Sequence, residues 1–142
     1  AISRINLALG SLRPQTEETD VLGAALMVQE LARRRSLLIY FTDLYGQALT
    51  GNFGQGIKLW RSRHLPFVVG LIGADIEELV EREAHSEADS FASLAAVHYR
   101  STVLSNSEAA RRLGAQAIVT RPAQALSYVT AEYELLKRQH RV

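Results

Sequence analysis

The sequence predicts an α/β protein of three layers, in which a parallel, Rossmann-like sheet carries helices on both faces. An unbroken apolar run from Ser36 to Asp43, rich in β-branched and aromatic residues, is typical of a strand buried on both faces. Similar runs occur at 65–72 and 115–120. Segments with helical spacing of apolar residues alternate with these strands, which implies βαβ units with right-handed crossovers.

Two helices are predicted ahead of the first strand. Apolar residues recur at helical spacing before Pro14, and a polar loop follows that proline. Thr19 or Asp20 can then cap the second helix, because a short polar side chain accepts a hydrogen bond from the free amides of a first turn. The apolar face of this second helix is expected to consist of Val21, Ala25, Val28 and Ala32.

Four helices are predicted after the first strand. A glycine-rich stretch leads into one that ends near His64, and a short helix at 75–82 follows the second strand. A long helix at about 88–113 ends before Gly114, since glycine is common directly after a helix C-terminus. Pro122 opens the last helix at the position that proline favours. Its apolar stripe is expected to consist of Leu126, Val129, Tyr133 and Leu136.

Composition and charge narrow the class of protein. The 142 residues fit one domain, so residues 1–142 are interpreted as a single α/β domain. A net charge of +1 gives no field suited to nucleic acid or to a membrane surface. The absence of cysteine excludes disulfides and a cysteine nucleophile, and it fits a reducing cytoplasm. No apolar stretch reaches the ~18 residues needed to cross a bilayer. We therefore expect a cytoplasmic location, although a longer parent protein could carry a membrane anchor.

Asp43 is the one carboxylate that its position marks as functional. It directly follows the first apolar run, where the predicted strand ends. Polar side chains at the carboxyl ends of parallel strands face the crevice in which such sheets bind ligands. The position predicts a site without naming a reaction.

The residues around this strand resemble those of a known family. The motif Arg-Arg-Arg-Ser-Leu-Leu-Ile-Tyr-Phe-Thr-Asp-Leu (33–44) is followed, in the same order, by the family's further motifs at 63–69, 74–79 and 133–137. Together they are similar to the von Willebrand factor A-like domain of uncharacterised bacterial proteins whose genes commonly neighbour MoxR-type AAA ATPases. The resemblance implies a non-catalytic protein-interaction module that acts with such an ATPase in the assembly or maturation of other proteins.

The family fold carries a metal-ion-dependent adhesion site at the carboxyl edge of its sheet. That site typically takes an Asp-x-Ser-x-Ser loop, a later threonine, which Thr19 matches, and an aspartate after the fourth strand, which Asp43 matches. Leu44 stands where many members carry glycine, and the Asp-x-Ser-x-Ser loop is absent. Mg²⁺ takes about six oxygen ligands, so Thr19 and Asp43 form only a partial site, and Mg²⁺ is expected in the intact parent domain. The resemblance thus implies that the chain is the carboxyl-terminal part of a larger protein.

An incomplete sheet would leave the first strand at an edge. Leu37, Ile39 and Phe41 project to one face of that strand, and Leu38 and Tyr40 to the other. Unpaired ladder groups and bare apolar side chains favour association, so we expect a homo-oligomer in which this strand or the helix at 21–32 takes part. In the alternative arrangement, the amino-terminal helix folds back and covers the edge.

A small-molecule or nucleotide-binding enzyme domain is the alternative function, based on the Gly46–Gly56 loop and Asp43. Four glycines lie between the first predicted strand and its helix, where a phosphate loop belongs: Gly46, Gly51, Gly54 and Gly56. The last three are ordered G-x-x-G-x-G, which is not the order of a dinucleotide turn, and no Lys-Ser or Lys-Thr follows. The interaction module is preferred, and no catalytic or cofactor-binding residue is assigned.

Other polar and aromatic residues have structural interpretations. His85, between Glu83 and Glu87, is a weak metal candidate because loop charges are usually solvated. His98 is expected to be a partly buried structural histidine. Phe53 and Trp60 are expected to pack in the core, with a contact to a partner protein as the alternative.

Overall fold

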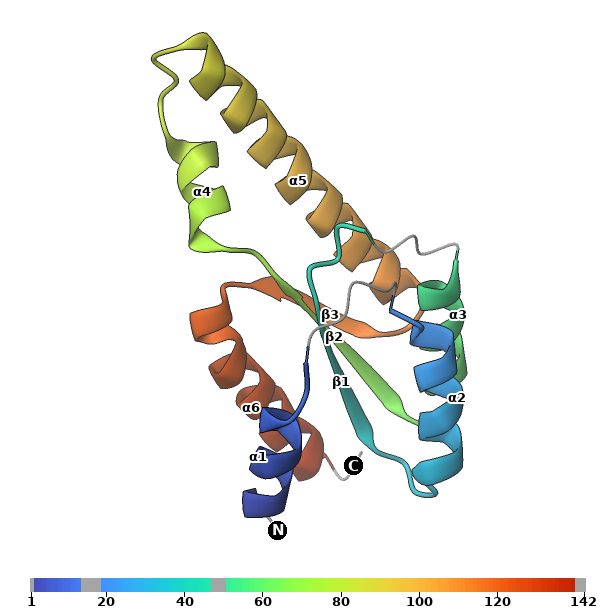
Figure 1. Ribbon diagram of the computed structural model, residues 1–142. Coiled ribbons are helices and arrows are strands. Elements are labelled where there is room, and N and C mark those ends of the chain that lie inside the picture. Colours follow the sequence, from blue (N-terminus) through green and yellow to red (C-terminus); the bar gives the residue numbers. More distant parts are fainter. Residues whose placement is uncertain (1, 14–18, 47–50, 140–142) are drawn as a thin grey trace.

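The computed structural model describes residues 2–13, 19–46 and 51–139. Nine helices and strands are found within these ranges (Figure 1). In chain order they are α1 (Ile2–Gly10), α2 (Val21–Leu31), β1 (Leu37–Thr42), α3 (Asn52–Arg61), β2 (Leu65–Leu71), α4 (Ala74–Glu81), α5 (Glu87–Arg112), β3 (Gln116–Thr120) and α6 (Pro122–Arg138).

The three strands form one parallel sheet in the order β1-β2-β3. Leu37 pairs with Leu65 at the start of β1, and Phe67 pairs with Gln116 at the start of β3. The predicted α/β class and parallel pairing are confirmed, and each strand begins and ends within one residue of its predicted bounds. The central strand β2 carries five consecutive buried residues, 66–70. The continuous apolar run therefore marks the strand with a neighbour on each side.

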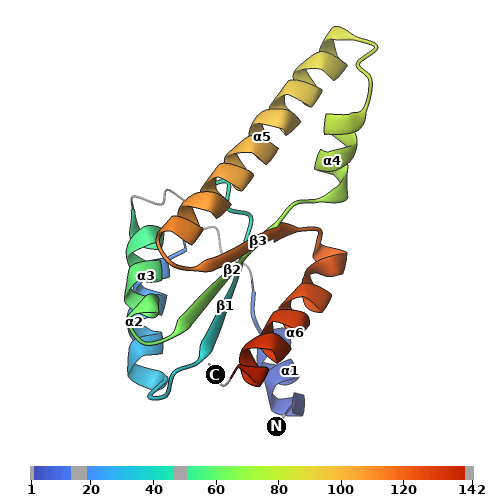
Figure 2. The same cartoon turned by 180° about the vertical axis from the view of Figure 1, so that it is seen from behind.

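Helices lie on both faces of the sheet (Figures 1 and 2). On one face α2, α3 and the carboxyl-terminal half of α5 pack against β2 through a core that includes Val21, Ile57, Val68 and Val103. On the other face α6 covers β2 and β3 through a smaller cluster of Phe67, Val69 and Ala125. Within the described ranges, none of the helices is long and apolar enough to cross a membrane.

The ends of the helices follow their local sequence. The Asp20 carboxylate caps α2 by accepting a hydrogen bond of 2.8 Å from the Gly23 amide, which selects Asp20 over Thr19 as the cap. Gly114 follows α5 with φ of +95°, a conformation that glycine adopts without strain. Pro122 occupies the first turn of α6 as predicted. The predicted face of α2 is confirmed, with Val21 and Ala25 fully buried.

The apolar stripe predicted for α6 is wrong in part. Leu126 is 76% exposed and Tyr133 is also exposed, whereas Ala125 and Leu136 are buried and Val129 packs on the core. Ala125 has a small side chain, which lets the first turns of α6 approach Phe67 and Val69 closely. The buried face of α6 thus includes the smaller Ala125 in place of the predicted Leu126.

The pair α4 and α5 extends beyond the sheet as an arm (Figure 1). At about 1.5 Å per residue the 26 residues of α5 span ~39 Å, whereas the five residues of β3 span ~17 Å. The buried residues of α5 lie mainly in its carboxyl-terminal half, at Val103, Ser107 and Ala110. The amino-terminal half therefore packs against α4 and not against the sheet.

Candidate functional site

The turn after β1 presents Asp43 at the carboxyl edge of the sheet. The Asp43 side chain is exposed, and its Oδ1 accepts a hydrogen bond of 3.2 Å from the Tyr45 amide. The preceding Thr42 Oγ1 accepts one of the same length from the Leu44 amide. These two local bonds hold a tight turn in which the carboxylate faces outward, as the position of Asp43 predicts.

Leu44 anchors this turn from within. Its φ of +58° lies in the left-handed region that favours glycine, and its side chain is fully buried. A methyl group on Gly70 of β2 would come within 2.7 Å of Leu44 Cδ1, so the missing side chain at Gly70 makes room for the leucine. Asn106 of α5 donates a hydrogen bond of 2.6 Å to the Leu44 carbonyl. Burial and this bond stabilise a backbone conformation that is otherwise unfavourable for leucine by about 1–2 kcal/mol.

Three tyrosines lie near Asp43: Tyr40, Tyr45 and Tyr99. The Tyr45 ring stacks on the Tyr99 ring of α5, with ring centroids 4.7 Å apart. Burial raises the pKa of Tyr99, and the negative charges of Asp43 and Asp75 raise it further. Burial also raises the pKa of Tyr40, with a smaller contribution from Asp43. Both phenols therefore remain protonated near neutral pH, and Tyr99 lies within the field of two carboxylates.

Sequence reasoning missed Asp75, Tyr99 and Asn106 as neighbours of this turn. Asp75 was interpreted only as the start of a helix, and it does lie in the first turn of α4. Tyr99 and Asn106 lie in the middle of α5, far from Asp43 in sequence. An acidic residue shortly after the second strand of a parallel sheet was the available signal, since neighbouring strands end at the same edge.

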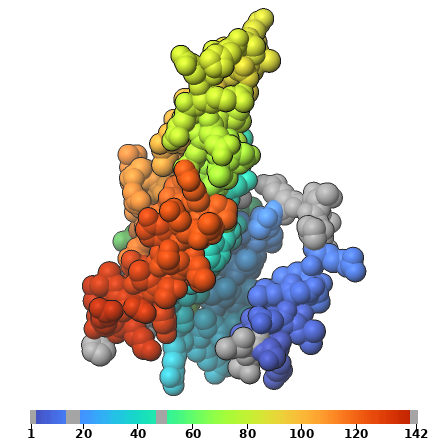
Figure 3. All heavy atoms as spheres, turned by 90° about the vertical axis from the view of Figure 1, so that its left-hand side faces the viewer, coloured from blue at the N-terminus to red at the C-terminus, as the bar shows by residue number. Residues whose placement is uncertain are grey.

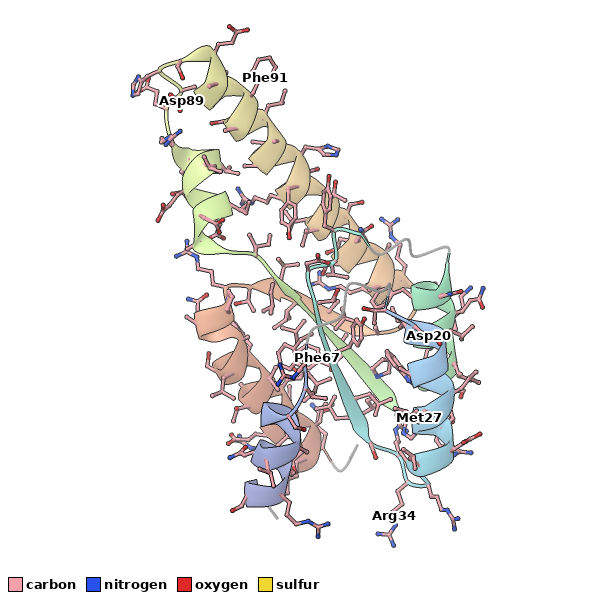
Figure 4. All side chains as sticks on the ribbon, in the orientation of Figure 1. Asp20, Met27, Arg34, Phe67, Asp89 and Phe91 are labelled. Carbon is pink, nitrogen blue, oxygen red and sulfur yellow. The ribbon has the colours of Figure 1, made fainter. Side chains whose placement is uncertain are left out.

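Thr19 lies at the amino end of α2, and Asp43 follows the carboxyl end of β1. The five residues 32–36 connect α2 to β1, and the two elements run in opposite directions, so both residues lie toward the same edge of the sheet. Figure 4 labels Asp20, the neighbour of Thr19, at this end of α2. Both residues are exposed, and no hydrogen bond joins them in the described structure. The fold thus brings the two predicted ligands to one edge without direct contact.

The described residues contain no group of three or more histidine, cysteine, aspartate or glutamate side chains arranged to hold a metal ion. Oxygen ligands toward this edge include the side chains of Asp43, Thr19, Asp20 and, on α4, Asp75. A hard cation would need water for most of its coordination shell. What these groups support chemically is weak cation binding or polar contact with another molecule.

The glycine-rich segment differs from its prediction. Helix α3 begins at Asn52, so Gly54 and Gly56 are buried helical residues and not parts of a loop. A methyl group on Gly56 would lie 3.3 Å from Val21 Cγ1, so this glycine allows α2 and α3 to pack closely. Residues 47–50 of the predicted Gly46–Gly56 loop lie outside the described residues. Gly56 therefore has a packing role and does not form part of a phosphate loop.

The remaining candidates are distributed over the molecule. Phe53 and Trp60 are buried and pack around Tyr40, which confirms the core interpretation. His98 is exposed, so its predicted partial burial is wrong; it lies on the solvent side of α5, edge-on to Tyr45. His85 is exposed beyond the end of α4. Among the described histidines, His64, directly before β2, is fully buried.

Comparison of the chain with protein-family models, with curated proteins and with solved structures finds no match.

Proposed function

We propose that this chain is the carboxyl-terminal part of a von Willebrand A-like domain and serves as a non-catalytic protein-interaction module. Its partner is a MoxR-type AAA ATPase, with which it acts in the assembly or maturation of other proteins. Asp43 and Thr19 are the partial metal site of this module, and Mg²⁺ binds fully only when the parent domain supplies further ligands. The observation that carries the proposal is the exposed Asp43 at the carboxyl edge of a parallel sheet.

The backbone at Leu44 supports the family assignment. The motif comparison placed Leu44 at a position where many family members carry glycine. A φ of +58° is what a glycine adopts readily and a leucine adopts only under constraint. The turn therefore keeps the shape that a glycine would give it, although the residue has changed.

The alternative, a nucleotide-binding enzyme domain, receives less support. Gly56 packs against Val21 and Ala25 at the α2–α3 contact. Asp75, like Asp43, raises the pKa of Tyr99 by its negative charge, and a second carboxylate near the turn repels phosphate. A thermal-shift titration with nucleotides distinguishes the two functions, because a bound ligand raises the unfolding temperature as its concentration increases. A saturable shift that Asp43→Ala abolishes would favour the enzyme.

The metal site is tested by calorimetry with Mg²⁺. We expect weak binding or none, because the chain offers two of about six ligands. Tight stoichiometric binding that is lost in both Asp43→Ala and Thr19→Ala would show that the site is complete within this chain. Glu134→Ala on α6 is the matched control, since it removes an exposed carboxylate near the far end of the sheet.

The partner is tested by biolayer interferometry with an immobilised MoxR-type AAA ATPase in the presence of Mg²⁺. We expect saturable binding that Asp43→Ala weakens at least about tenfold, while Glu134→Ala leaves it unchanged. If the chain does not bind the ATPase, or if both variants bind equally well, the proposed partner or the proposed site is wrong.

A further inference from the structure

The arm formed by α4 and α5 carries apolar side chains that are exposed and do not pack in the core. Phe91 is 65% exposed and Leu94 is 66% exposed, both near the amino end of α5. Val97 follows Leu94 by three residues, and Leu104 follows Val97 by seven. These helical spacings continue the same side of α5. Figure 4 shows Phe91 at the tip of the arm, far from the sheet. These four residues, together with Val80, are called the arm stripe below.

A hollow accompanies the arm stripe where α4 meets α5. It has a volume of about 260 Å³ and is lined by Val80, Val97, Arg100, Ser101 and Leu104. Ser101, which has a small side chain, lies between Val97 and Leu104 on the helix. A row of apolar residues beside a shallow hollow is the shape that receives one face of a helix.

The arm is acidic, and the rest of the molecule is basic. Residues 74–105 contain seven acidic and two basic residues, a net charge of −5. The remaining residues contain eight acidic and fourteen basic residues, a net charge of +6. The two basic residues of the arm are Arg82 and Arg100. Arg82 forms an ion pair with Asp89 at 2.5 Å. Figure 4 shows Asp89 at the tip of the arm and Arg34 at the opposite end of the molecule.

The acidic side chains lie beside the arm stripe. Glu87 is exposed and precedes Phe91 by four residues and Leu94 by seven, so the three share one side of α5. Glu81, also exposed, directly follows Val80 at the end of α4. Glu83 is exposed in the connection between the two helices. A partner that covers the arm stripe must therefore approach carboxylates along its rim.

We propose that the arm stripe is a docking site for a basic amphipathic helix of a partner protein. The apolar face of that helix covers Phe91, Leu94 and the hollow at Ser101, and its lysines or arginines approach Glu81, Glu83 and Glu87. Complementary charge at the rim of an interface increases the rate of association and selects the partner, while the apolar centre supplies most of the affinity. This surface goes beyond the proposed function because it uses neither Asp43 nor β1.

The charge of the arm argues against other occupants. Nucleic acids and anionic membranes are repelled by a net charge of −5. A symmetric contact between the arms of two copies would place like charges together. The basic end of a second copy is the remaining alternative, and the experiment below distinguishes it.

The test uses a fluorescent leucine–lysine peptide of about 18 residues, which forms roughly five turns of an amphipathic helix. Binding to the full chain is measured by fluorescence anisotropy. One control peptide has the same composition in an order without helical periodicity, and the other replaces each lysine by glutamate. We expect saturable binding of the first peptide, binding at least about tenfold weaker for the scrambled one, and none for the acidic one.

Two variants probe the two components of the surface separately. Phe91→Ser combined with Leu94→Ser is expected to weaken peptide binding at least about tenfold. Glu83→Lys combined with Glu87→Lys is expected to weaken it and to flatten its dependence on salt, because fewer charge contacts remain to be screened. Circular dichroism confirms that each variant is folded. The matched controls are Leu126→Ser and Glu134→Lys on α6, which change equally exposed residues away from the arm.

Three results would overturn the proposal. Equal binding of the scrambled peptide would show attraction by charge alone. Equal losses in the arm variants and in the α6 controls would place the peptide elsewhere. Concentration-dependent self-association in analytical ultracentrifugation that the arm variants abolish would identify a second copy as the occupant.

Discussion

The two edges of the sheet differ in whether a side chain forms hydrogen bonds with their unpaired backbone groups. On β3, the Thr120 carbonyl accepts a hydrogen bond of 3.0 Å from the Ile72 amide and therefore points toward β2. Because successive carbonyls of a strand point to opposite sides, the Ala117 carbonyl, three residues earlier, points away from β2. Arg111 of α5 donates to this carbonyl from Nε at 2.8 Å and from Nη2 at 2.5 Å. A cation that occupies an edge carbonyl prevents another strand from pairing there.

Within the described ranges, the edge at β1 has no comparable side chain bonded to its backbone. Ser36 O accepts from the Leu65 amide at 2.9 Å, so the polar backbone groups of Leu37, Ile39 and Phe41 point outward by the same alternation. Among the described residues, no side chain donates to or accepts from the backbone of Leu37–Thr42. Ile39 is 40% exposed and Phe41 is 53% exposed. The open edge and the bare apolar face therefore occur on the same strand.

The face beside this edge is also incompletely covered. A hollow of about 380 Å³ lies between β1 and α6, lined by Arg35, Ser36, Leu37, Ile39 and Tyr133. Figure 3 shows α6 and α1 on either side of the exposed strand. Ile5, Leu7 and Leu9 of α1 are exposed, so this helix does not cover β1. The alternative arrangement, in which the amino-terminal helix covers the edge, is therefore wrong for the described residues. The comparison indicates that β3 ends the sheet, whereas β1 is suited to further pairing, and the expected homo-oligomer through β1 remains our proposal.

The largest expected effect separates the buried centre from the open edge. Phe67→Ala on β2 removes a buried ring and is expected to lower the free energy of unfolding by about 3–5 kcal/mol. Phe41→Ala, the same change on the same face of β1, is expected to lower it by less than about 1 kcal/mol because half of the ring is already in water. Urea denaturation at a concentration that keeps the chain monomeric measures both. Equal losses would mean that β1 is covered in solution.

Association through β1 is expected to weaken by about tenfold or more in Phe41→Lys. A lysine on an edge strand disfavours pairing with a second strand and places a charge on the bare face. Light scattering at micromolar concentration measures the oligomer, with Leu126→Lys on α6 as the control for an exposed apolar residue elsewhere. A wild-type chain that is strictly monomeric, with amides of 36–43 protected from exchange, would contradict an associating edge.

Opening the β3 edge is expected to have a smaller effect. Arg111→Ala leaves the Ala117 carbonyl without its donor, and we expect a loss of about 1 kcal/mol in unfolding free energy and increased self-association. Arg112→Ala is the matched control, because Arg112 is an exposed neighbour with no hydrogen bond to β3 among the described contacts. If Arg111→Ala leaves association unchanged, the guanidinium does not protect this edge.

The smallest expected effect is a pH dependence at the start of the β1–β2 pairing. Burial lowers the pKa of His64, with a further contribution from Arg63, and neither ring nitrogen has a hydrogen-bond partner among the described residues. The unfolded chain therefore takes up a proton first, so stability is complete above about pH 6.5 and is lost as the pH falls toward the lower pKa of the folded state. The slope is at most ~1.4 kcal/mol per pH unit. Denaturation from pH 7.5 to 5 of wild type and His64→Phe measures it, and identical profiles would contradict the assignment.

The order and type of the elements could be predicted from local sequence. The apolar runs at 36–43, 65–72 and 115–120 carry β-branched residues that suit a pleated, buried surface, and each became a strand. Asp20, Gly114 and Pro122 act at helix ends through their own side chains or backbone, so their roles require no distant partner. The exposed position of Asp43 followed from the same strand ending.

Other features depend on contacts between residues far apart in the chain. Asn106 and Gly70 hold Leu44 in its left-handed conformation, and neither is close to it in sequence. Gly56 lies within α3 against Val21 and Ala25 of α2, a contact that a pattern of glycines cannot show.

Local sequence determined which segments are helices and strands, because backbone preference and hydrophobic periodicity act over a few residues. The tertiary structure decided which face of α6 is buried, with Ala125 inside and Leu126 exposed. It also decided that α5 extends beyond the sheet and forms an arm with exposed apolar side chains and a net negative charge. It also decided that Arg111 closes one edge while β1 stays open. Each of these depends on burial and hydrogen bonding between distant segments, which exist only once the chain has folded.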